Sequence, residues 1–248
     1  MSQVHNRHSG CLLMLFLLCL LCVASTAFAD ITSNLQLWWR CDENTGTTVA
    51  DSTGNGHTGT LTNGATWTSS GRMGAACNFD GVNDYVTGSA VSLTTAVTAA
   101  AWINPTTFTD GTAQQVFETS SDSVTIRIAT SSTDRVSGFI LNASSVYVEA
   151  FSTTALAAGV WSHVALTYDG SVVRMYVNGT EVSTSGVAQT GNVKSSATMQ
   201  IGIHANLTSN PFGGAIDEFR VYTRALTSAD ITELANSTQD IHRVLVVQ

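Results

Sequence analysis

The feature that most constrains the fold is a two-residue alternation of side chains that recurs along the chain. It is clearest in residues 123–128 (SVTIRI) and 145–150 (SVYVEA). Because successive side chains of a β-strand point to opposite faces, this period indicates strands with one buried face. The pairs Asp169-Gly170 and Asn178-Gly179 separate further such segments and favour tight hairpin turns. The other predicted strands lie within residues 35–38, 76–80, 85–86, 97–103, 161–168, 172–177, 199–203 and 215–222.

One short helix is predicted near the C-terminus. Thr227-Ser-Ala-Asp230 has the spacing of a capping box, and Ile231 and Leu234 follow it with the spacing of one helix face. About a dozen short strands and a single helix predict an all-β fold, a two-sheet antiparallel jelly-roll β-sandwich in one domain. The apolar residues 241–248 form either a last strand or a loosely placed chain end.

The first 29 residues have the organisation of a secretion signal. A weakly basic head contains Arg7, residues 11–23 are apolar, and Ala27-Phe28-Ala29 supplies the small residues that precede cleavage. A membrane-spanning helix needs about 20 apolar residues, so the apolar stretch favours cleavage over a retained anchor. We therefore expect an exported protein with no membrane span after signal removal: secreted and extracellular, or held at the cell surface or in the periplasm.

The charge balance excludes some partners. The chain carries 10 Lys and Arg against 18 Asp and Glu, a net charge of −8, and Arg7 leaves with the signal. A negative surface repels phosphate groups, so we expect neither nucleic acid nor anionic lipid as a partner.

Cys41 and Cys77 are the two cysteines that remain after the signal is removed. Two cysteines cannot complete a four-ligand zinc site. An even number in an oxidising compartment favours a disulfide. It would close a loop of about 36 residues and stabilise the fold by about 3–4 kcal/mol. The alternative is a pair of buried free thiols.

Four stretches of sequence point to a known family. They are residues 37–86 with the motifs DENTG, ADSTGNG and NFDGVNDYV, residues 100–103 (AAWI), residues 161–170 (WSHVALTYDG) with YVNG at 176–179, and residues 213–226 (GGAIDEFRVYTRAL). In this order and spacing they resemble the laminin-G-like jelly roll of the concanavalin A-like lectin/glucanase superfamily. The resemblance implies that residues 30–240 form one such domain. It leaves the function open, because the superfamily includes lectins, adhesion modules, pentraxin-like proteins and glycanases.

The cysteines are a departure from this family pattern. Cys41 and Cys77 stand where many relatives carry an apolar residue, on two strands that lie near each other. If those strands pair, the cysteines are cross-strand neighbours, which fits the disulfide that family members often carry.

The resemblance also implies a structural calcium ion. In related domains calcium often lies between an Asn-Gly loop and an Ile-Asp-Glu strand. Here this implies Asp51 and Asp217 as side-chain ligands, with Asn55 and His57 binding through backbone carbonyls. Calcium takes six to eight oxygen ligands, and the glycines of residues 51–57 (DSTGNGH) let carbonyls converge.

The strand that contains Asp217 supports the same expectation. Regular alternation places this carboxylate on one face with Ala215, Phe219 and Val221, which should be the apolar face. A buried carboxylate there needs a partner. The alternative to calcium is a metal-free turn whose backbone amides bind Asp217.

The sequence offers no catalytic motif, and we predict that the protein is not an enzyme. Retaining glycanases of this superfamily carry Glu-x-Asp-x-x-Glu on one strand, and that motif is absent. Asp217 and Glu218 are adjacent, so on a regular strand they point to opposite faces and cannot act as a pair. His163 is expected to be a structural histidine within a strand.

The ligand-binding residues stay unassigned. Residues 106–114 and 204–212 form long polar loops, and the turn at 80–84 (DGVND) either binds a second calcium or hydrogen-bonds to its own backbone. We expect a secreted, non-catalytic binding module for glycans or another extracellular surface. A structural or adhesive protein-binding domain is one alternative, and a glycanase with an unrecognised active site is the other.

Overall fold

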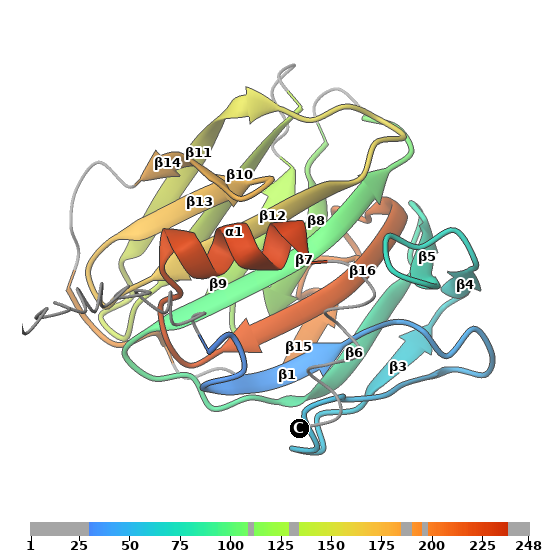
Figure 1. The fold of residues 1–248 in the computed structure, drawn as a ribbon, viewed down its shortest axis with the longest axis horizontal. Helices are drawn as coiled ribbons and strands as arrows, with labels where there is room; N and C mark the ends of the chain where they lie inside the picture. Colours follow the sequence, from blue (N-terminus) through green and yellow to red (C-terminus); the bar gives the residue numbers. More distant parts are fainter. Residues whose placement is uncertain (1–29, 109–111, 129–133, 185–189, 195–197, 238–248) are drawn as a thin grey trace, which may run out of the picture.

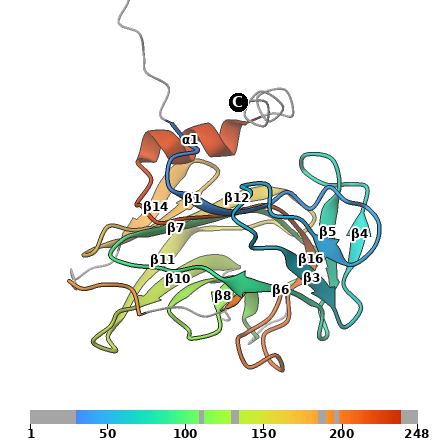
Figure 2. The same ribbon diagram turned by 90° about the horizontal axis from the view of Figure 1, so that it is seen from below.

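The structure is a computed structural model that describes residues 30–108, 112–128, 134–184, 190–194 and 198–237. The predicted secretion signal and residues 241–248 lie outside this part of the chain. Two antiparallel sheets pack face to face, and one helix lies against the outer face of the first sheet (Figure 1, Figure 2). The predicted all-β sandwich with one short helix is confirmed.

Each sheet has eight strands within the described residues. The first has the order β14 (Thr180–Thr184), β13 (Val173–Val177), β12 (Ser162–Tyr168), β7 (Val97–Pro105), β16 (Gly213–Tyr222), β5 (Ala76–Asp80) and β4 (Thr66–Thr68), and β1 (Leu35–Trp39) also pairs with β16. The second has the order β11 (Tyr147–Ala155), β10 (Arg135–Leu141), β9 (Val124–Ile128), β8 (Gln114–Thr119), β15 (Thr198–Ile201), β6 (Tyr85–Ala90), β3 (Gly59–Thr62) and β2 (Thr48–Val49).

The core lies between the sheets and is centred on aromatic side chains. The ring of Phe219 lies 5.5 Å from that of Trp39 and 4.8 Å from that of Phe117, measured between centroids. Gly59 and Gly88 lie against the Trp39 indole, and a Cβ atom on either glycine would overlap it. These two strand glycines therefore make room for the largest side chain of the core.

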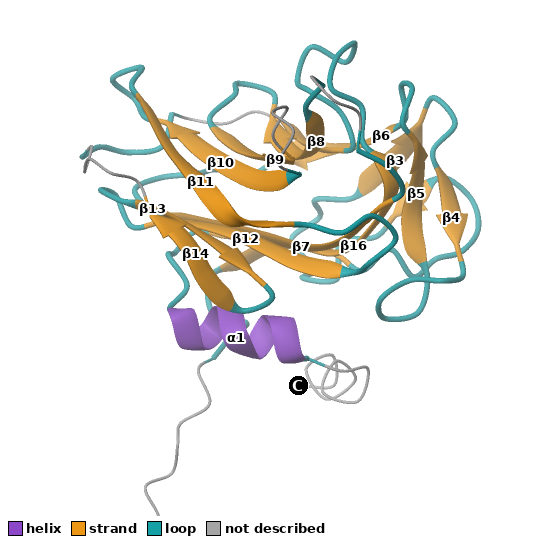
Figure 3. Ribbon diagram, turned by 90° about the horizontal axis from the view of Figure 1, so that it is seen from above, coloured by secondary structure: helices purple, strands orange, loops and turns teal. Residues whose placement is uncertain are grey.

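The helix α1 (Ser228–Asn236) begins as predicted. Thr227 accepts a hydrogen bond from the Asp230 amide, and Asp230 reaches back to the Thr227 amide, which completes the capping box. Ile231 and Leu234 are buried with Tyr222 in a second apolar cluster. Figure 3 shows α1 on the side of the first sheet that faces away from the second. The helix thus covers part of one outer face of the sandwich.

The two predicted hairpin turns are confirmed. Asp169-Gly170 connects β12 to β13, and Asn178-Gly179 connects β13 to β14. Asn178 and Gly179 have φ angles of 50° and 82°, the conformation that a type I′ turn requires at both central positions.

The expectation for the faces of β16 was wrong. The pairing of β16 with β7 shifts register between Asp217 and Arg220, and Glu218 has a φ angle of 55°. Ile216, Phe219 and Val221 all belong to the main core. The inward-facing residue is therefore even-numbered before this bulge and odd-numbered after it. Asp217 therefore does not share a face with Phe219 and Val221.

Candidate functional site

The outer face of the second sheet carries a continuous row of polar and aromatic side chains. Thr125 of β9 lies opposite Glu118 of β8 and Phe139 of β10, and Arg127 lies opposite Ser137. Because directly opposed residues of paired strands share a face, these side chains form one surface. Helix α1 lies on the other sheet and leaves this surface uncovered (Figure 3).

Two exposed aromatic rings lie at the edge of this surface, on β11. Val148 and Ala150 are buried, whereas Tyr147 and Phe151 are 58% and 56% exposed. The Tyr147 ring packs edge-on against Phe139, with centroids 5.3 Å apart. Half-exposed aromatic rings present flat apolar faces to solvent, the type of surface on which sugar rings stack.

An ion pair lies between the two exposed rings. Arg127 pairs with Glu149 at 3.0 Å and donates to the Ser137 hydroxyl at 3.2 Å. Its guanidinium group also lies 5.4 Å from the centroid of the Phe139 ring. These contacts hold a charged donor and a charged acceptor in fixed positions beside the aromatic rings.

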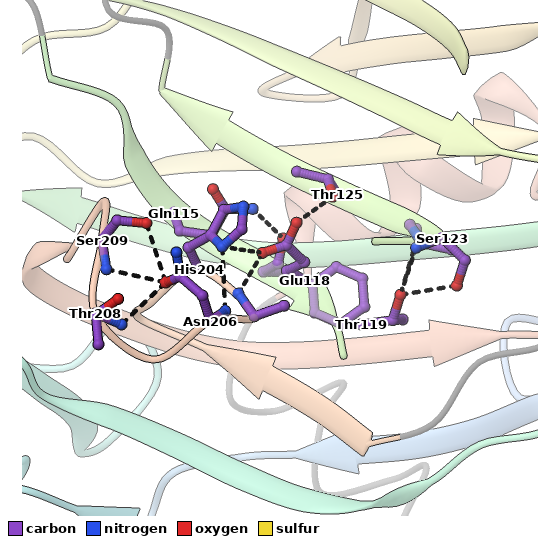
Figure 4. Close-up of polar contacts among 12 residues, drawn as sticks. Gln115, Glu118, Thr119, Ser123, Thr125, His204, Asn206, Thr208 and Ser209 are labelled. Atoms are coloured by element: carbon purple, nitrogen blue, oxygen red, sulfur yellow. Dashed lines mark hydrogen bonds and ion pairs between the residues drawn. The ribbon is translucent and has the colours of Figure 1, made fainter. Parts of the chain in front are cut away.

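A buried carboxylate fixes the loop that borders this surface (Figure 4). Glu118 is 1% exposed; one oxygen accepts from the Thr125 hydroxyl at 3.1 Å, and the other accepts from the Ala205 amide at 2.6 Å. Burial raises the pKa of Glu118 to about 7, and the charge of Asp122 adds to the shift. Asn206 accepts three hydrogen bonds from Thr208 and Ser209, which makes the loop compact.

The same cluster contains three groups that could bind a metal ion. Glu118, Asp122 and His204 each offer one ligand atom, and these atoms lie within 4.8 Å of one another. His204 Nδ1 already accepts from the Asn206 amide at 3.2 Å, and both oxygens of Glu118 accept protein hydrogen bonds. Protein donors therefore occupy the lone pair of His204 Nδ1 and one lone pair on each oxygen of Glu118.

The sequence analysis missed Glu118 and the exposed rings. Glu118 and Ala205 are 87 residues apart, and no local pattern links them. The alternation at residues 145–150 did show that Tyr147 shares a face with Glu149. The alternation could not show which of the two faces is exposed. Tyr147 on one face and Val148 on the other are both side chains that a core can contain.

The predicted calcium ligands belong to two separate sets of hydrogen bonds. Asp51 Oδ1 accepts from the Trp38 amide and from the amide and hydroxyl of Thr53, and its Oδ2 accepts from the His57 amide at 2.9 Å. The His57 carbonyl accepts from the Trp39 indole, and the Asn55 side chain donates to backbone carbonyls of β1. Asp51, Asn55 and His57 thus form one hydrogen-bonded loop against β1.

Asp217 lies in a different environment. Its Oδ2 accepts from the Met73 amide at 2.9 Å, and its buried Oδ1 has no hydrogen-bond partner among the described residues. Burial raises the pKa of Asp217 to about 8, and the charges of Glu218 and Asp42 act in the same direction. No hydrogen bond or ion pair in the described part of the chain joins Asp217 to Asp51.

The two cysteines lie together, as expected for neighbouring strands. Strands β1 and β5 both pair with β16, on the edge opposite β7, and Cys41 follows β1 while Cys77 lies in β5. Their Sγ atoms are 2.7 Å apart, and both residues are buried. Burial raises the pKa of both thiols.

The turn at residues 80–84 hydrogen-bonds to its own backbone. Asp80 Oδ1 accepts from the Val82 amide at 2.8 Å, and Asp84 Oδ2 accepts from the Asp80 amide at 2.9 Å. These are the backbone hydrogen bonds that the sequence analysis gave as the alternative to a second calcium ion. His163 is buried in β12 against the Trp102 ring, in agreement with a structural role.

The fold and this open outer face define a jelly-roll domain of the lectin-like class. Residues 79–232 match the sequence profile of the laminin G type family of the concanavalin A-like lectin/glucanases superfamily. The chain belongs to this family. A comparison with curated proteins finds no match.

Solved structures with the same fold include several binding domains. Domain 4 of AbnA, a GH43 extracellular arabinanase from Geobacillus stearothermophilus, in complex with arabinotriose, is 24% identical with a TM-score of 0.66, and the match covers 82% of this chain and 98% of that one. The binding domain of Paraclostridial Mosquitocidal Protein 1 is 14% identical with a TM-score of 0.67, covering 84% of this chain and 53% of that one. The binding domain of botulinum neurotoxin DC in complex with SialylT is 13% identical with a TM-score of 0.63, covering 84% and 52%.

The match thus covers nearly all of the arabinanase domain and about half of each toxin binding domain. Among the described residues, no helix is both long and apolar enough to cross a membrane.

Proposed function

We propose that this protein is an exported, non-catalytic carbohydrate-binding module that binds glycans on the outer face of its second sheet. The observation that carries the proposal is the pair of half-exposed rings, Tyr147 and Phe151, on either side of Glu149 in β11. Exposed aromatic faces beside fixed polar groups are the usual composition of a sugar-binding surface. The arabinotriose complex of the similar arabinanase domain supports the choice of glycan.

Each group on this surface has a distinct role in the proposal. Tyr147 and Phe151 stack on sugar rings. Glu149 accepts hydrogen bonds from sugar hydroxyls, and Arg127 donates to hydroxyl or ring oxygens while it stays held by Ser137. The loop that contains His204 forms the border of the surface, because Glu118 holds its backbone against the sheet.

The test is a glycan and polysaccharide array probed with the purified protein. A Tyr147→Ala/Phe151→Ala variant should bind at least tenfold more weakly, since each lost stacking contact corresponds to about a few-fold to tenfold. Val160→Ala, at an exposed apolar residue elsewhere, is the matched control and should bind like the wild type. A blank array would contradict the proposal and would favour a protein-binding or structural role. Hydrolysis of a bound glycan would instead establish an enzyme.

The proposal includes a structural calcium ion. Asp217 fits such an ion, because its Oδ1 is buried without a partner and a second carboxylate, Asp42, is near enough to affect its pKa. Asp51 fits it less well, because its two oxygens already accept four hydrogen bonds from the protein. Calcium bound at Asp217 would favour the ionised carboxylate, which burial otherwise disfavours.

The proposal also includes the Cys41–Cys77 disulfide. The two buried sulfur atoms are already in contact, and the thiols have no other sulfur to pair with in the described chain. A bridge would connect the ends of β1 and β5, which pair with different parts of the same edge of β16.

A further inference from the structure

The exposed aromatic rings of the described chain are confined to one strand. Of the aromatic side chains among the described residues, only Tyr147 and Phe151 are exposed, and both lie on β11, at the end of the strand order of the second sheet. A glycan that crossed the strands from Phe151 would meet Ser137 and Arg127 and no second exposed ring. A glycan that stacks on both rings must therefore run along β11.

The strand is regular between the two rings. The pairing of β11 with β10 continues without a shift from Leu141 opposite Tyr147 to Ser137 opposite Phe151. A strand advances by about 3.3 Å per residue, so the Cα atoms of Tyr147 and Phe151 are about 13 Å apart. The even spacing in sequence also places both side chains on the same face. The two rings are thus separate stacking platforms on one line.

The position of the Tyr147 ring is restrained by its neighbours. It packs edge-on against the Phe139 ring, with an angle of 74° between the two planes. Phe139 is itself buried, and the Arg127 guanidinium lies beside it at 5.4 Å from the ring centroid. A large movement of the Tyr147 ring would break its contact with Phe139. The distance between the two stacking platforms is therefore a defined property of the surface.

The surface between the two rings is polar. Glu149 lies midway between Tyr147 and Phe151 in sequence and on the same face of β11. Its carboxylate pairs with Arg127, and the two side chains keep 27% and 32% of their surface exposed. A sugar unit located between two stacked units would therefore meet groups that bind hydroxyls and would find no aromatic ring beneath it.

The size of a sugar ring determines how many units this arrangement can bind. A six-membered sugar ring is similar in size to a phenyl ring, and rings of that size in contact have their centres about 4.5–7 Å apart. Two linked sugar units therefore span only about half of the distance of about 13 Å between Tyr147 and Phe151. A third unit is needed before one glycan chain can stack on both rings.

From this spacing we infer that the surface on β11 selects linear glycans of at least three consecutive sugar units, bound along the strand. One unit stacks on Tyr147 and another on Phe151, and the unit or units between them hydrogen-bond to Glu149 and Arg127. Monosaccharides and disaccharides reach only one ring. The inference rests on the proposed glycan-binding function and adds to it the minimum length and the direction of the bound chain.

The test is calorimetric titration of the purified protein with linear arabino-, xylo- and cello-oligosaccharides of one to six units, and with the same lengths of any other polysaccharide that binds on the array. In at least one series the affinity should rise about tenfold between the disaccharide and the tetrasaccharide and change little beyond it. Tyr147→Ala and Phe151→Ala, tested singly, should each remove this rise. Tyr147→Phe keeps the ring, so it is the matched control and should retain the rise.

The outcomes separate this inference from the proposed function. If disaccharides bind as tightly as tetrasaccharides, the length selection is overturned while the glycan-binding function stands. A rise with length that survives both Tyr147→Ala and Phe151→Ala overturns it too, because the longer chain would then gain its contacts away from the two rings. No binding in any series overturns the inference and the proposed function together. Thermal melting shows whether each variant is folded, and the ratio of the two affinities in one variant does not depend on its folded fraction.

Discussion

The Glu118 carboxylate accepts a hydrogen bond from the Ala205 amide at 2.6 Å, which joins β8 to a loop 87 residues further along the chain. The carboxylate is buried, and its bond to the half-buried Ala205 holds the loop on the outer face of the second sheet. A side chain and a backbone amide that are far apart in sequence therefore define the border of the proposed glycan-binding surface.

Glu118→Ala should destabilise the fold and release this loop. Loss of a hydrogen bond to this buried carboxyl group costs about 1–3 kcal/mol. Denaturant unfolding measures that loss, and hydrogen exchange of the Ala205 amide reports on the loop. Glu118→Gln keeps an acceptor oxygen and should retain most of the protection. Fast exchange at Ala205 in both variants, or in neither, would contradict this assignment of the bond.

Acid should weaken the fold through His163. Burial lowers the pKa of His163 from 6.5 to about 3, and the positive charges of Arg220 and Arg72 add to the shift. Between these two pH values the unfolded chain binds a proton that the folded protein does not. The stabilisation is present in full above pH 6.5 and is lost as the pH falls towards 3.

The variant His163→Phe isolates this contribution. It cannot bind a proton, so its free energy of unfolding should fall less between pH 7 and pH 4 than that of the wild type. Denaturant titrations of both proteins at the two pH values measure the difference. Equal losses in the two proteins would show that other groups govern the acid response.

The cysteine pair should be oxidised in the exported protein. Thiol titration of the unfolded, unreduced protein should find no free thiol, because Cys41 and Cys77 are in contact. Reduction, or the variant Cys41→Ala/Cys77→Ala, should lower the free energy of unfolding by up to about 3–4 kcal/mol. Two titratable thiols in the unreduced protein would refute the bridge.

Calcium should stabilise the protein through Asp217 and not through Asp51. Melting with calcium and with a chelator should give different midpoints for the wild type, and Asp217→Asn should remove that difference. Asp51→Asn should lower both midpoints by a similar amount, because it weakens the hydrogen bonds that hold the loop. A wild-type midpoint unchanged by chelator, with no ion in the purified protein, would contradict a structural calcium.

The sequence predicted most of the architecture because the relevant signals are local. The turns at Asp169-Gly170 and Asn178-Gly179 and the capping box at Thr227 each depend on neighbouring residues, and all three are confirmed. The bulge at Glu218 could not be predicted in the same way. It depends on how β16 pairs with β7, and one extra residue reversed the expected direction of Asp217.

The candidate site was harder to predict for a related reason. Alternation in β11 groups Tyr147 with Glu149 and Phe151, but it does not tell which group faces the core when both groups contain apolar residues. The hydrogen bond between Glu118 and Ala205 joins residues that are 87 positions apart, so no local pattern predicts it. Tertiary pairing supplied the missing information in both cases.

Helix α1 makes the two outer faces of the sandwich different, and this difference determines how the protein would be oriented on a bound glycan. It lies on the outer face of the first sheet, opposite the surface that carries Tyr147 and Phe151 (Figure 3). A protein held on a polysaccharide fibre by that surface would therefore point its helix away from the fibre. A tag or reporter joined after α1 should remain accessible to antibody while the fibre is bound.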